Sequence, residues 1–406
     1  MSPLTVLKDR TKSELQESHA LSGRERPERL SYLDWLRVLA VLGVFYAHAL
    51  SIFNIFSWHL SDARLGSLIV FGTEWGMALF FLLAGASAWF SLGKRSGRAF
   101  LWERFARLAI PFVVGVLLLS PPQGFFLDSS RSLYHGSFLA YYPSFFQHIS
   151  LSLTPEVLGA YGFNLWFLAV LFLFSLISLP LLLGLRRAGG KRFIRWLAAL
   201  CERPAGIFLL LIPLALIQVA LRASFPGYQG WTDFCLWLAF FLLGYLLLAD
   251  PRFTAAIRKQ GRLMLTVTIV SLLALLATMY GPDIIHLWQS APSYSLSYVL
   301  YQLLAVLVAW SLMLFVLFFG MRFLNRDNAV IQYANEAILP FYILHHFMIV
   351  MFASLLIVWK VPGIINFLVV TTLSLAATLL VYELCIRRIP LMRRLFGMRG
   401  ERERKA

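Results

Sequence analysis

Ten apolar stretches dominate this 406-residue chain, and each is close to the length that a helix needs to cross a lipid bilayer. A helix rises roughly 1.5 Å per residue, so about 20 apolar residues span the hydrocarbon layer. The stretches lie near residues 35–56, 66–90, 106–121, 164–185, 205–222, 232–249, 262–280, 298–320, 338–359 and 363–386. The sequence therefore predicts an all-α, polytopic membrane protein with about ten transmembrane helices.

The basic residues are distributed unevenly between the intervals that separate these stretches. If successive intervals alternate between the two sides of the membrane, 32 of the 36 Lys and Arg residues lie on the side that holds both termini. An excess of Lys and Arg marks cytoplasmic loops, which predicts cytoplasmic N- and C-termini. This distribution accounts for the formal net charge of +16 without a nucleic-acid partner. The expected surroundings are a lipid bilayer.

No interval is both long and polar enough to fold as a second domain. Residues 1–30 are polar and lack the apolar core of a signal peptide, so we expect a disordered cytoplasmic lead. Residues 31–390 form the predicted membrane domain, and residues 391–406 form a basic cytoplasmic tail. The three cysteines show neither metal nor disulfide spacing and are expected to be inert. The sequence sets no oligomeric state.

The longest predicted outer interval, about 122–163, is rich in aromatic side chains. They include Phe125, Phe126, Tyr134, Tyr141, Tyr142, Phe145 and Phe146. Aromatic side chains with a polar end favour the headgroup zone of a bilayer, so these residues could anchor the chain there. The alternative is a stacking platform for sugar rings at the outer mouth of a site.

Ionisable side chains inside a membrane are costly unless they are paired or face a polar cavity, so they are candidates for function. Arg37 and His48 lie 11 residues apart on one predicted helix, which is three turns plus about 20°. They share a face, with Arg37 near the cytoplasmic mouth and His48 about 16 Å further along the axis. Such a face suits an anionic donor that enters from the cytoplasm. The alternative is a snorkelling arginine beside a hydrogen-bonded histidine.

Glu74 lies in the second predicted span, at a depth similar to that of His48. A carboxylate beside a histidine fixes the tautomer of the imidazole and raises its basicity. The pairing of Glu74 with His48 requires the two helices to face each other at this depth.

Arg104 and Arg107 form a second basic group, at the predicted start of the third span. A spacing of three places both side chains on one side of a helix. Pairs of guanidinium groups bind phosphate well through their planar fork of donors. Pro111 follows four residues later and is expected to kink the helix. Ordinary anchoring by cytoplasmic basic residues is the alternative.

His345 and His346 are adjacent, so on a helix their side chains point about 100° apart and cannot both face one ligand. We expect one of them to line a cavity and the other to bond a neighbour's backbone. Asp233, Glu336 and Glu383 fall near the ends of spans, where water is close, and are interpreted as structural. Because His and carboxylate residues show no paired i, i+4 spacing, no metal site is expected.

Four short motifs stand in order along the chain. They are Tyr32-Leu-Asp-Trp-Leu-Arg37 followed by His48, Leu79-Phe-Phe-Leu-Leu-Ala-Gly85, Arg104-X-X-Arg107-X-X-X-Pro111, and Leu165-Trp-Phe-Leu168. Their order and spacing resemble the acyltransferase-3 family of bacterial integral membrane acyltransferases, over nearly all of residues 31–390. Ala84 replaces the serine that is usual in the family's second motif.

Within the family, Trp58-His59 and His345-His346 resemble the glucan-modifying subgroup, inner-membrane enzymes that attach succinyl groups to periplasmic glucans. Two features depart from the family pattern. Asn164 stands where a histidine often precedes the fourth motif, which removes a titratable group. The outer loops also lack a fused hydrolase-like domain, so we expect the membrane domain alone to handle the acceptor.

The resemblance implies a multi-pass enzyme of the inner cell membrane. It would transfer an acyl group, acetyl or succinyl, from cytoplasmic acyl-CoA to a carbohydrate hydroxyl of a cell-envelope glycan, with acyl-CoA as co-substrate and no bound cofactor. His48 would act as general base on the acceptor hydroxyl, a role worth roughly 10²–10⁴-fold in rate. An acyl-histidine relay is the other route. Glu74 would orient His48. The donor phosphates would be bound by Arg37, Arg104 and Arg107. The residues expected to border the outer mouth are Trp58, His59, Asn164 and Trp166.

A transporter or flippase for glycans or lipid precursors is the alternative from another functional class, because buried charges and an aromatic outer loop are equally expected there. Transporters often contain inverted repeats with broken helices, and the sequence shows no convincing repeat. A sensor or scaffold with a lapsed active site is a third reading. Transfer of a labelled acyl group from acyl-CoA to a sugar would separate the enzyme from both.

Overall fold

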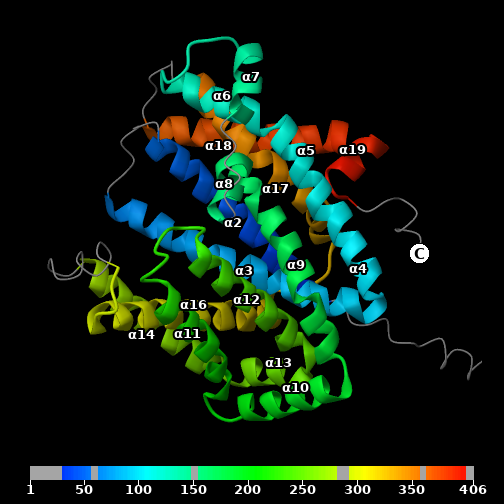
Figure 1. Ribbon diagram of the computed structural model, residues 1–406, viewed down its shortest axis with the longest axis vertical. Helices are drawn as coiled ribbons and strands as arrows, with labels where there is room; N and C mark the ends of the chain where they lie inside the picture. Colours follow the sequence, from blue (N-terminus) through cyan, green and yellow to red (C-terminus); the bar gives the residue numbers. More distant parts are fainter. Residues whose placement is uncertain (1–29, 56–62, 148–153, 281–291, 357–362, 399–406) are drawn as a thin grey trace, which may run out of the picture.

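A computed structural model of the chain describes residues 30–55, 63–147, 154–280, 292–356 and 363–398. These residues form helices joined by turns and short connections, with no strand among them (Figure 1). The elements are α2 (Ser31–Ile55), α3 (Ala63–Lys94), α4 (Gly97–Arg104), the π-helical η1 (Phe105–Ala109), α5 (Ile110–Leu118), α6 (Ser120–Ser130), α7 (Phe138–Gln147), α8 (Glu156–Gly162), η2 (Phe163–Leu165), α9 (Trp166–Leu185), α10 (Ala188–Cys201), η3 (Gly206–Leu210), α11 (Leu211–Leu221), α12 (Trp231–Ala249), α13 (Pro251–Lys259), α14 (Gly261–Tyr280), α16 (Leu296–Phe323), α17 (Ala329–Leu356), α18 (Gly363–Val381), the π-helical η5 (Tyr382–Ile386) and α19 (Pro390–Leu395).

Eight helical segments among the described residues are long and apolar enough to cross a membrane. They are Ser31–Ile52, Gly76–Lys94, Phe163–Leu185, Trp231–Ala249, Gly261–Thr278, Leu296–Phe323, Ala329–Leu356 and Ile364–Ile386. Each corresponds to one of the ten predicted stretches. The prediction of an all-α, multi-pass membrane protein is therefore confirmed for the described part of the chain.

The other two predicted spans, 106–121 and 205–222, differ from a straight transmembrane helix. The helical segment Gly97–Leu118 bends by 40° into α6, where Ser120 is followed by two prolines that lack the amide hydrogen of a regular helix. The second stretch is a shorter apolar helix, Gly206–Leu221, whose first turn is 3-10 helical. By length and composition the described residues thus provide eight spans, or nine if the bent pair is one span.

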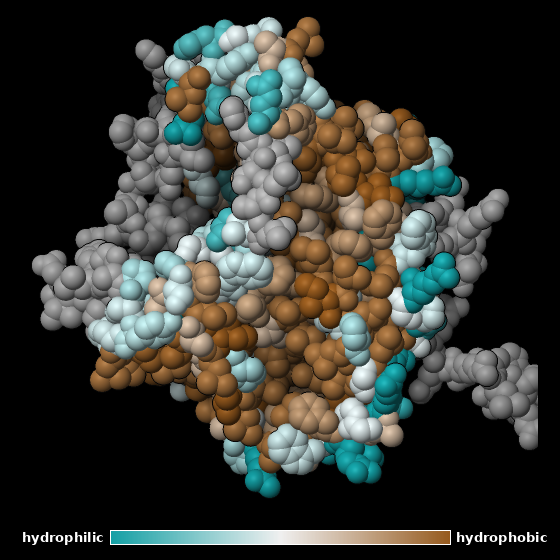
Figure 2. All heavy atoms as spheres, viewed as in Figure 1, coloured by the Kyte–Doolittle hydropathy of each residue, from teal (hydrophilic) through white to brown (hydrophobic). Residues whose placement is uncertain are grey.

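The surface of the described residues agrees with a membrane environment. Figure 2 shows apolar side chains over most of the visible face, with hydrophilic side chains gathered at its edges. The amphipathic helices α10 and α13 lie side by side at one end of the molecule (Figure 1). Both come from intervals whose basic residues predict the cytoplasmic side.

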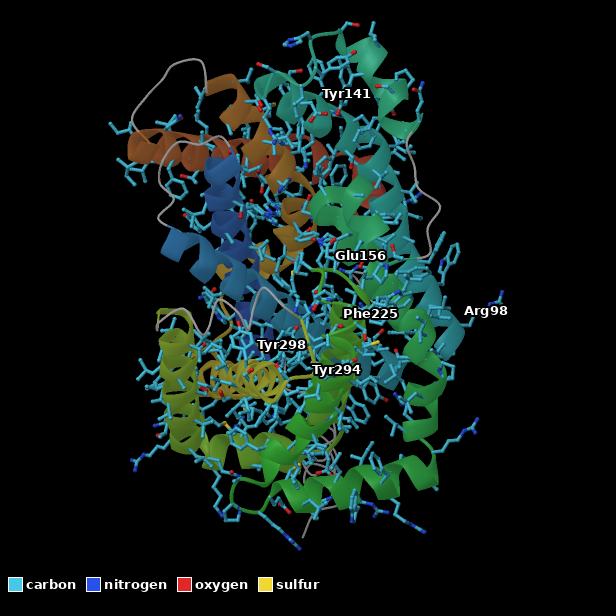
Figure 3. All side chains as sticks on the ribbon, turned by 60° about the vertical axis from the view of Figure 1, so that its left-hand side comes forward. Arg98, Tyr141, Glu156, Phe225, Tyr294 and Tyr298 are labelled. Carbon is cyan, nitrogen blue, oxygen red and sulfur yellow. The ribbon has the colours of Figure 1, made fainter. Side chains whose placement is uncertain are left out.

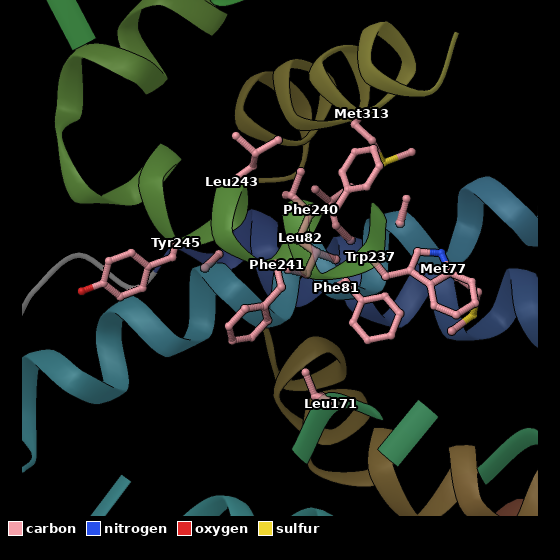
Figure 4. Packing of buried hydrophobic residues seen from close by; sticks show 14 of the residues in the cluster. Met77, Phe81, Leu82, Leu171, Trp237, Phe240, Phe241, Leu243, Tyr245 and Met313 are labelled. Carbon is pink, nitrogen blue, oxygen red and sulfur yellow. The ribbon is translucent and has the colours of Figure 1, made fainter. Parts of the chain in front are cut away.

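Helices α3 and α12 cross at two glycines, and this crossing forms the centre of the main core. A Cβ atom on Gly85 would collide with the carbonyl group of Phe241, and one on Gly244 with the carbonyl group of Leu82. Small residues let membrane helices approach closely enough for backbone contact. Figure 4 shows aromatic rings beside this crossing, among them Phe81, whose ring contacts Trp237 of α12 at 5.5 Å and Phe174 at 5.0 Å. Gly85 is the last residue of the second motif.

Helices α2 and α17 form a second apolar cluster. Val41, Phe45, Ala49 and Ile52 recur every three or four residues along α2, so they form one stripe. This stripe packs against apolar residues of α17 that begin at Phe341. The packing fixes the rotation of α2 about its own axis, and with it the side to which its ionisable residues point.

The α3–α12 crossing generates a first prediction. Gly85→Ala should lower the stability of the folded protein by about 1–3 kcal/mol, because a methyl group has to be fitted against a backbone carbonyl. Gly93→Ala on the same helix is the matched control, since a Cβ atom there meets nothing within 4 Å. Thermal unfolding of the detergent-solubilised protein measures both variants. Equal unfolding temperatures would show that the close crossing is not required.

Candidate active site

A cavity of about 460 Å³ lies among α2, α3, the end of α4, η1, α9, α17, α19 and the residues that follow α19. Its charged lining residues are Arg37, Arg104, Arg107, Glu336 and Arg393. The volume is within the usual range for a small-molecule site. Four guanidinium groups against one carboxylate make the lining strongly basic, which favours an anionic ligand. The three arginines that the sequence singled out therefore share one cavity.

Arg37 is held in the cavity wall by both α2 and α3. Its guanidinium group donates to Asp34 Oδ1 at 3.1 Å, to the backbone oxygen of Leu83 at 3.3 Å and to Ser87 Oγ. The carboxylate one turn earlier on α2 partly offsets the charge, while the bonds to α3 fix the direction of the side chain. The side chain of Arg37 is therefore fixed in the cavity wall and does not extend freely toward the membrane surface.

Arg104 and Arg107 flank the start of a π-helical turn, η1. The ring of Pro111 would clash with the carbonyl of Arg107 in a regular α-helix, and the wider turn replaces the expected simple kink. Such π-helical turns occur frequently at functional sites. The buried Nε of Arg104 has no hydrogen-bond partner among the described residues, and its Cζ lies 5.1 Å from the centre of the Phe100 ring. Arg107 Nε donates to the backbone oxygen of Gly397 at 3.1 Å.

Three histidines meet where α2 packs on α17. The ring centres of His48 and His346 are 4.5 Å apart and those of His48 and His345 are 5.5 Å apart. The rings of the two adjacent histidines are perpendicular to each other, and both lie beside His48, although adjacent helical positions predicted that they could not face one ligand. No single helix carries this cluster, so sequence spacing alone could not reveal it.

The hydrogen bonds of His345 define its tautomer. Its Nδ1 lies 2.8 Å from the backbone oxygen of Tyr342 and 3.2 Å from that of Phe341. Because carbonyl oxygens only accept hydrogen bonds, Nδ1 carries the proton and Nε2 keeps a lone pair. That Nε2, and the Nδ1 of His346, are buried without a hydrogen-bond partner among the described residues. His345 thus bonds the backbone of its own helix, whereas the backbone of a neighbour was expected, and neither histidine is among the residues that line the basic cavity.

Asn164 links the histidine cluster to α9. Its Nδ2 donates to the backbone oxygen of Tyr342 at 2.9 Å, and the Tyr342 hydroxyl donates to the backbone oxygen of Asn164. Phe163 beside it has a φ of 46°, in the left-handed region, and its ring stacks on His346 at 6.3 Å. A non-glycine residue adopts this conformation at an energetic cost, and residues held in it cluster at functional sites. The residue that replaces the family histidine therefore positions the turn of α17 that precedes the two histidines.

The remaining predicted site residues are placed as follows. Trp166 is buried and stacks on Trp237 with ring centres 4.8 Å apart, so it lies in the packed core. Glu74 lies on α3, but its side chain is outside the described part of the structure. Trp58 and His59 lie outside the described residues altogether. The acceptor-side roles of these residues, and the pairing of Glu74 with His48, stay predictions.

The acidic residues interpreted as structural divide into two groups. Asp233 forms an ion pair with Arg222 and accepts from the backbone N–H of Gln229 at 2.9 Å, while Glu383 forms an ion pair with Arg387 on the next helical turn at 2.9 Å. Glu336 differs in its position, because it lines the basic cavity and forms an ion pair with Arg393, and its interpretation as structural stays a prediction. The sequence signal for this position is a carboxylate, Glu336, that lies one helical turn before Pro340 in an otherwise apolar span.

The aromatic interval forms a small packed unit from α6 and α7. Tyr141, labelled in Figure 3, donates to Asp128 Oδ2 at 2.7 Å and its ring contacts that of Tyr134 at 5.0 Å. Burial and then this hydrogen bond raise the pKa of the Tyr141 hydroxyl above its usual range. The rings of this unit therefore contact one another extensively, and both anchoring and sugar stacking stay predictions.

The reciprocal bonds between Asn164 and Tyr342 generate a second prediction. Tyr342→Phe should lower stability by about 1–3 kcal/mol, since it leaves the buried carbonyl of Asn164 without this donor. The same change at Tyr46, which is 47% exposed, should have little effect. Thermal unfolding is the measurement, and an unchanged unfolding temperature for Tyr342→Phe would contradict the positioning role.

Comparison with known proteins identifies the family of the chain. The acyltransferase-3 family, described as an acyltransferase domain, matches residues 30–383. The glucans biosynthesis protein C of Salmonella schwarzengrund (strain CVM19633), of Salmonella agona (strain SL483) and of Salmonella heidelberg (strain SL476) are each 24% identical over 381 residues, covering 90% of this chain and 94% of the relative. No solved protein structure matches the chain. The chain belongs to the acyltransferase-3 family and is a multi-pass membrane enzyme that transfers acyl groups.

Proposed function

We propose that this enzyme transfers an acyl group, acetyl or succinyl, from cytoplasmic acyl-CoA to a carbohydrate hydroxyl of a cell-envelope glycan at the inner membrane. The observation that carries the proposal is the placement of a basic cavity and a histidine cluster at different depths along the same two helices, α2 and α17. The names of the relatives, which refer to glucans, favour a glucan as the acceptor.

The basic cavity suits the anionic part of a CoA thioester. Guanidinium groups bind phosphate oxygens through two parallel hydrogen bonds, and such charge-assisted bonds are roughly twice as strong as neutral ones. Arg104 supports this role, because its buried Nε has no hydrogen-bond partner among the described residues. Arg37 and Arg107 add further donors from two other elements. These arginines position the donor and take no part in bond making.

The histidine cluster suits the chemical step. In that step the acceptor oxygen attacks the thioester carbonyl carbon while its proton passes to a ring nitrogen of His48. The carbon–sulfur bond then breaks, and the departing thiolate takes the proton back from the imidazolium group. The lone pair on Nε2 of His345 makes this residue a candidate to orient His48. Glu74 remains a second candidate for the same role.

The distance between the two parts fits a long, thin donor arm. Val41 lines the cavity and His48 follows seven residues later, which is about 10 Å along the helix axis. Phe45 lies one turn beyond Val41, with its ring centre 5.8 Å from that of Phe341. The acyl-bearing arm of the donor has to pass these two rings to reach the histidines.

An acyl-histidine relay is the other route through the same residues. In that route a nitrogen of His48 attacks the thioester first, releases CoA, and then passes the acyl group to the acceptor hydroxyl. Mass spectrometry of the protein incubated with acyl-CoA, without acceptor, separates the routes. An increase in mass on the peptide that contains His48 indicates the relay, and its absence indicates direct transfer.

The assignment of His48 generates a third prediction. His48→Ala should lower the rate of acyl transfer roughly 10²–10⁴-fold, because the acceptor hydroxyl loses its base. His135→Ala removes an exposed histidine and is the control. The measurement is transfer of a radiolabelled acyl group from acyl-CoA to purified glucan, at matched protein levels. Wild-type rates for His48→Ala would contradict the assignment.

The donor site generates a fourth prediction. The double variant Arg104→Ala, Arg107→Ala should weaken acyl-CoA binding by at least about tenfold, because each charge-assisted bond contributes on the order of 1.5 kcal/mol or more. Arg98→Ala is the matched control, since this exposed arginine projects outward from α4 (Figure 3). Binding is measured by calorimetry on the full-length protein. Unchanged affinity in the double variant would remove the phosphate role.

A further inference from the structure

The segment that follows the last long helix forms part of the wall of the basic cavity. Arg393, Gly397 and Met398 all line the cavity, although the family match ends at residue 383. Figure 1 shows α19 beside α5, on the same side of the molecule as α4. The sequence places these residues in or next to a polar cytoplasmic tail, so no motif of the family draws attention to them.

Arg393 is the part of this segment that a ligand would meet. It is 8% exposed, whereas the adjacent Arg394 is exposed to solvent. Its guanidinium group donates to the backbone oxygen of Arg387 at 3.1 Å and lies 3.5 Å from Glu336 Oε1. A guanidinium group so deeply buried has to be paired, and Glu336 is the carboxylate that lies within ion-pair distance of it.

Gly397 docks this segment against the helix that carries the other arginines. Its φ is +69°, and a Cβ atom there would come within 2.7 Å of the backbone oxygen of Arg107 and 3.0 Å of Pro111. Both the conformation and the space require glycine. The carbonyl oxygen of Gly397 accepts from Arg107 Nε at 3.1 Å. The docked segment therefore touches the proposed donor site directly.

We propose that residues 390–398 form part of the donor site. In this site Arg393 binds an anionic group of the CoA thioester, and Glu336 pairs with Arg393 when no donor is bound. The inference rests on the proposed function. In this arrangement the donor anion competes with Glu336 for Arg393. Removal of the arginine therefore weakens donor binding, whereas removal of the carboxylate charge strengthens it.

A merely structural Arg393–Glu336 pair makes a different prediction. Loss of either partner would then leave the other charge buried without its counter-ion. Both variants would be destabilised, and neither would bind the donor more tightly. Opposite changes in affinity are thus specific to the ligand-binding role.

The test is calorimetric titration of the full-length protein in lipid nanodiscs with CoA as the probe. Arg393→Gln is expected to raise the Kd for CoA roughly fivefold or more. Arg394→Gln, which removes the same charge from the next residue, should stay within about twofold of wild type. Glu336→Gln should lower the Kd by roughly threefold or more.

The outcomes separate the inference from the proposed function. Wild-type affinity in Arg393→Gln, together with weakened binding in the Arg104, Arg107 double variant, would overturn the inference and leave the proposed donor site intact. If the wild-type protein does not bind CoA, both the inference about Arg393 and the proposed donor site are contradicted. If Arg393→Gln does not fold, Glu336→Gln decides, since unchanged or weaker CoA binding by this variant contradicts the proposal.

Discussion

Ionisable side chains inside a hydrocarbon layer are stable only where they are paired or face a polar space. Several arginines among the described residues follow this constraint. Arg222 lies against Asp233, and Arg37 is bonded to Asp34 and to α3. The arginines that exceed the nearby carboxylates line one cavity, which is why that cavity is basic. The same constraint makes the unpaired nitrogens of His345 and His346 informative, since a buried polar atom without a partner is costly.

Helix packing then determines where these groups meet. The apolar stripe on α2 packs against α17 and brings His48 to His345 and His346. The close crossing of α3 and α12 at Gly85 holds the helix that bonds Arg37. Asn164 and Tyr342 lock α9 to α17 just before the histidines. The cavity and the cluster are thus two consequences of the same few helix contacts.

The sequence predicts much of this arrangement, and the missing part has a physical reason. Spacing along one helix is enough to group Arg37 with His48, or Arg104 with Arg107. Contacts between helices are harder to predict, because a side that faces lipid is as apolar as a side that faces protein, so the apolar pattern of a span does not show which side packs. The contact between His48 and His345 could therefore not be predicted from the sequence.

The two irregular spans have local causes. Two prolines after Ser120 bend the third predicted span, and the fifth begins only at Gly206, after Ala205 with a left-handed φ of 58°. Glu336 was interpreted by its depth alone, and its ion-pair partner Arg393 lies 57 residues later in the chain. Charge and burial on one segment do not predict a partner on another.

The central claim is that donor and acceptor reach the histidine cluster from opposite faces of the membrane. Transfer across sealed vesicles tests it most directly, using protein oriented with its C-terminus accessible to protease. With glucan enclosed, acyl-CoA added outside should acylate the enclosed glucan. With the same orientation, glucan and acyl-CoA both supplied only outside should give no product. Product in the second arrangement, or none in the first, would contradict the account.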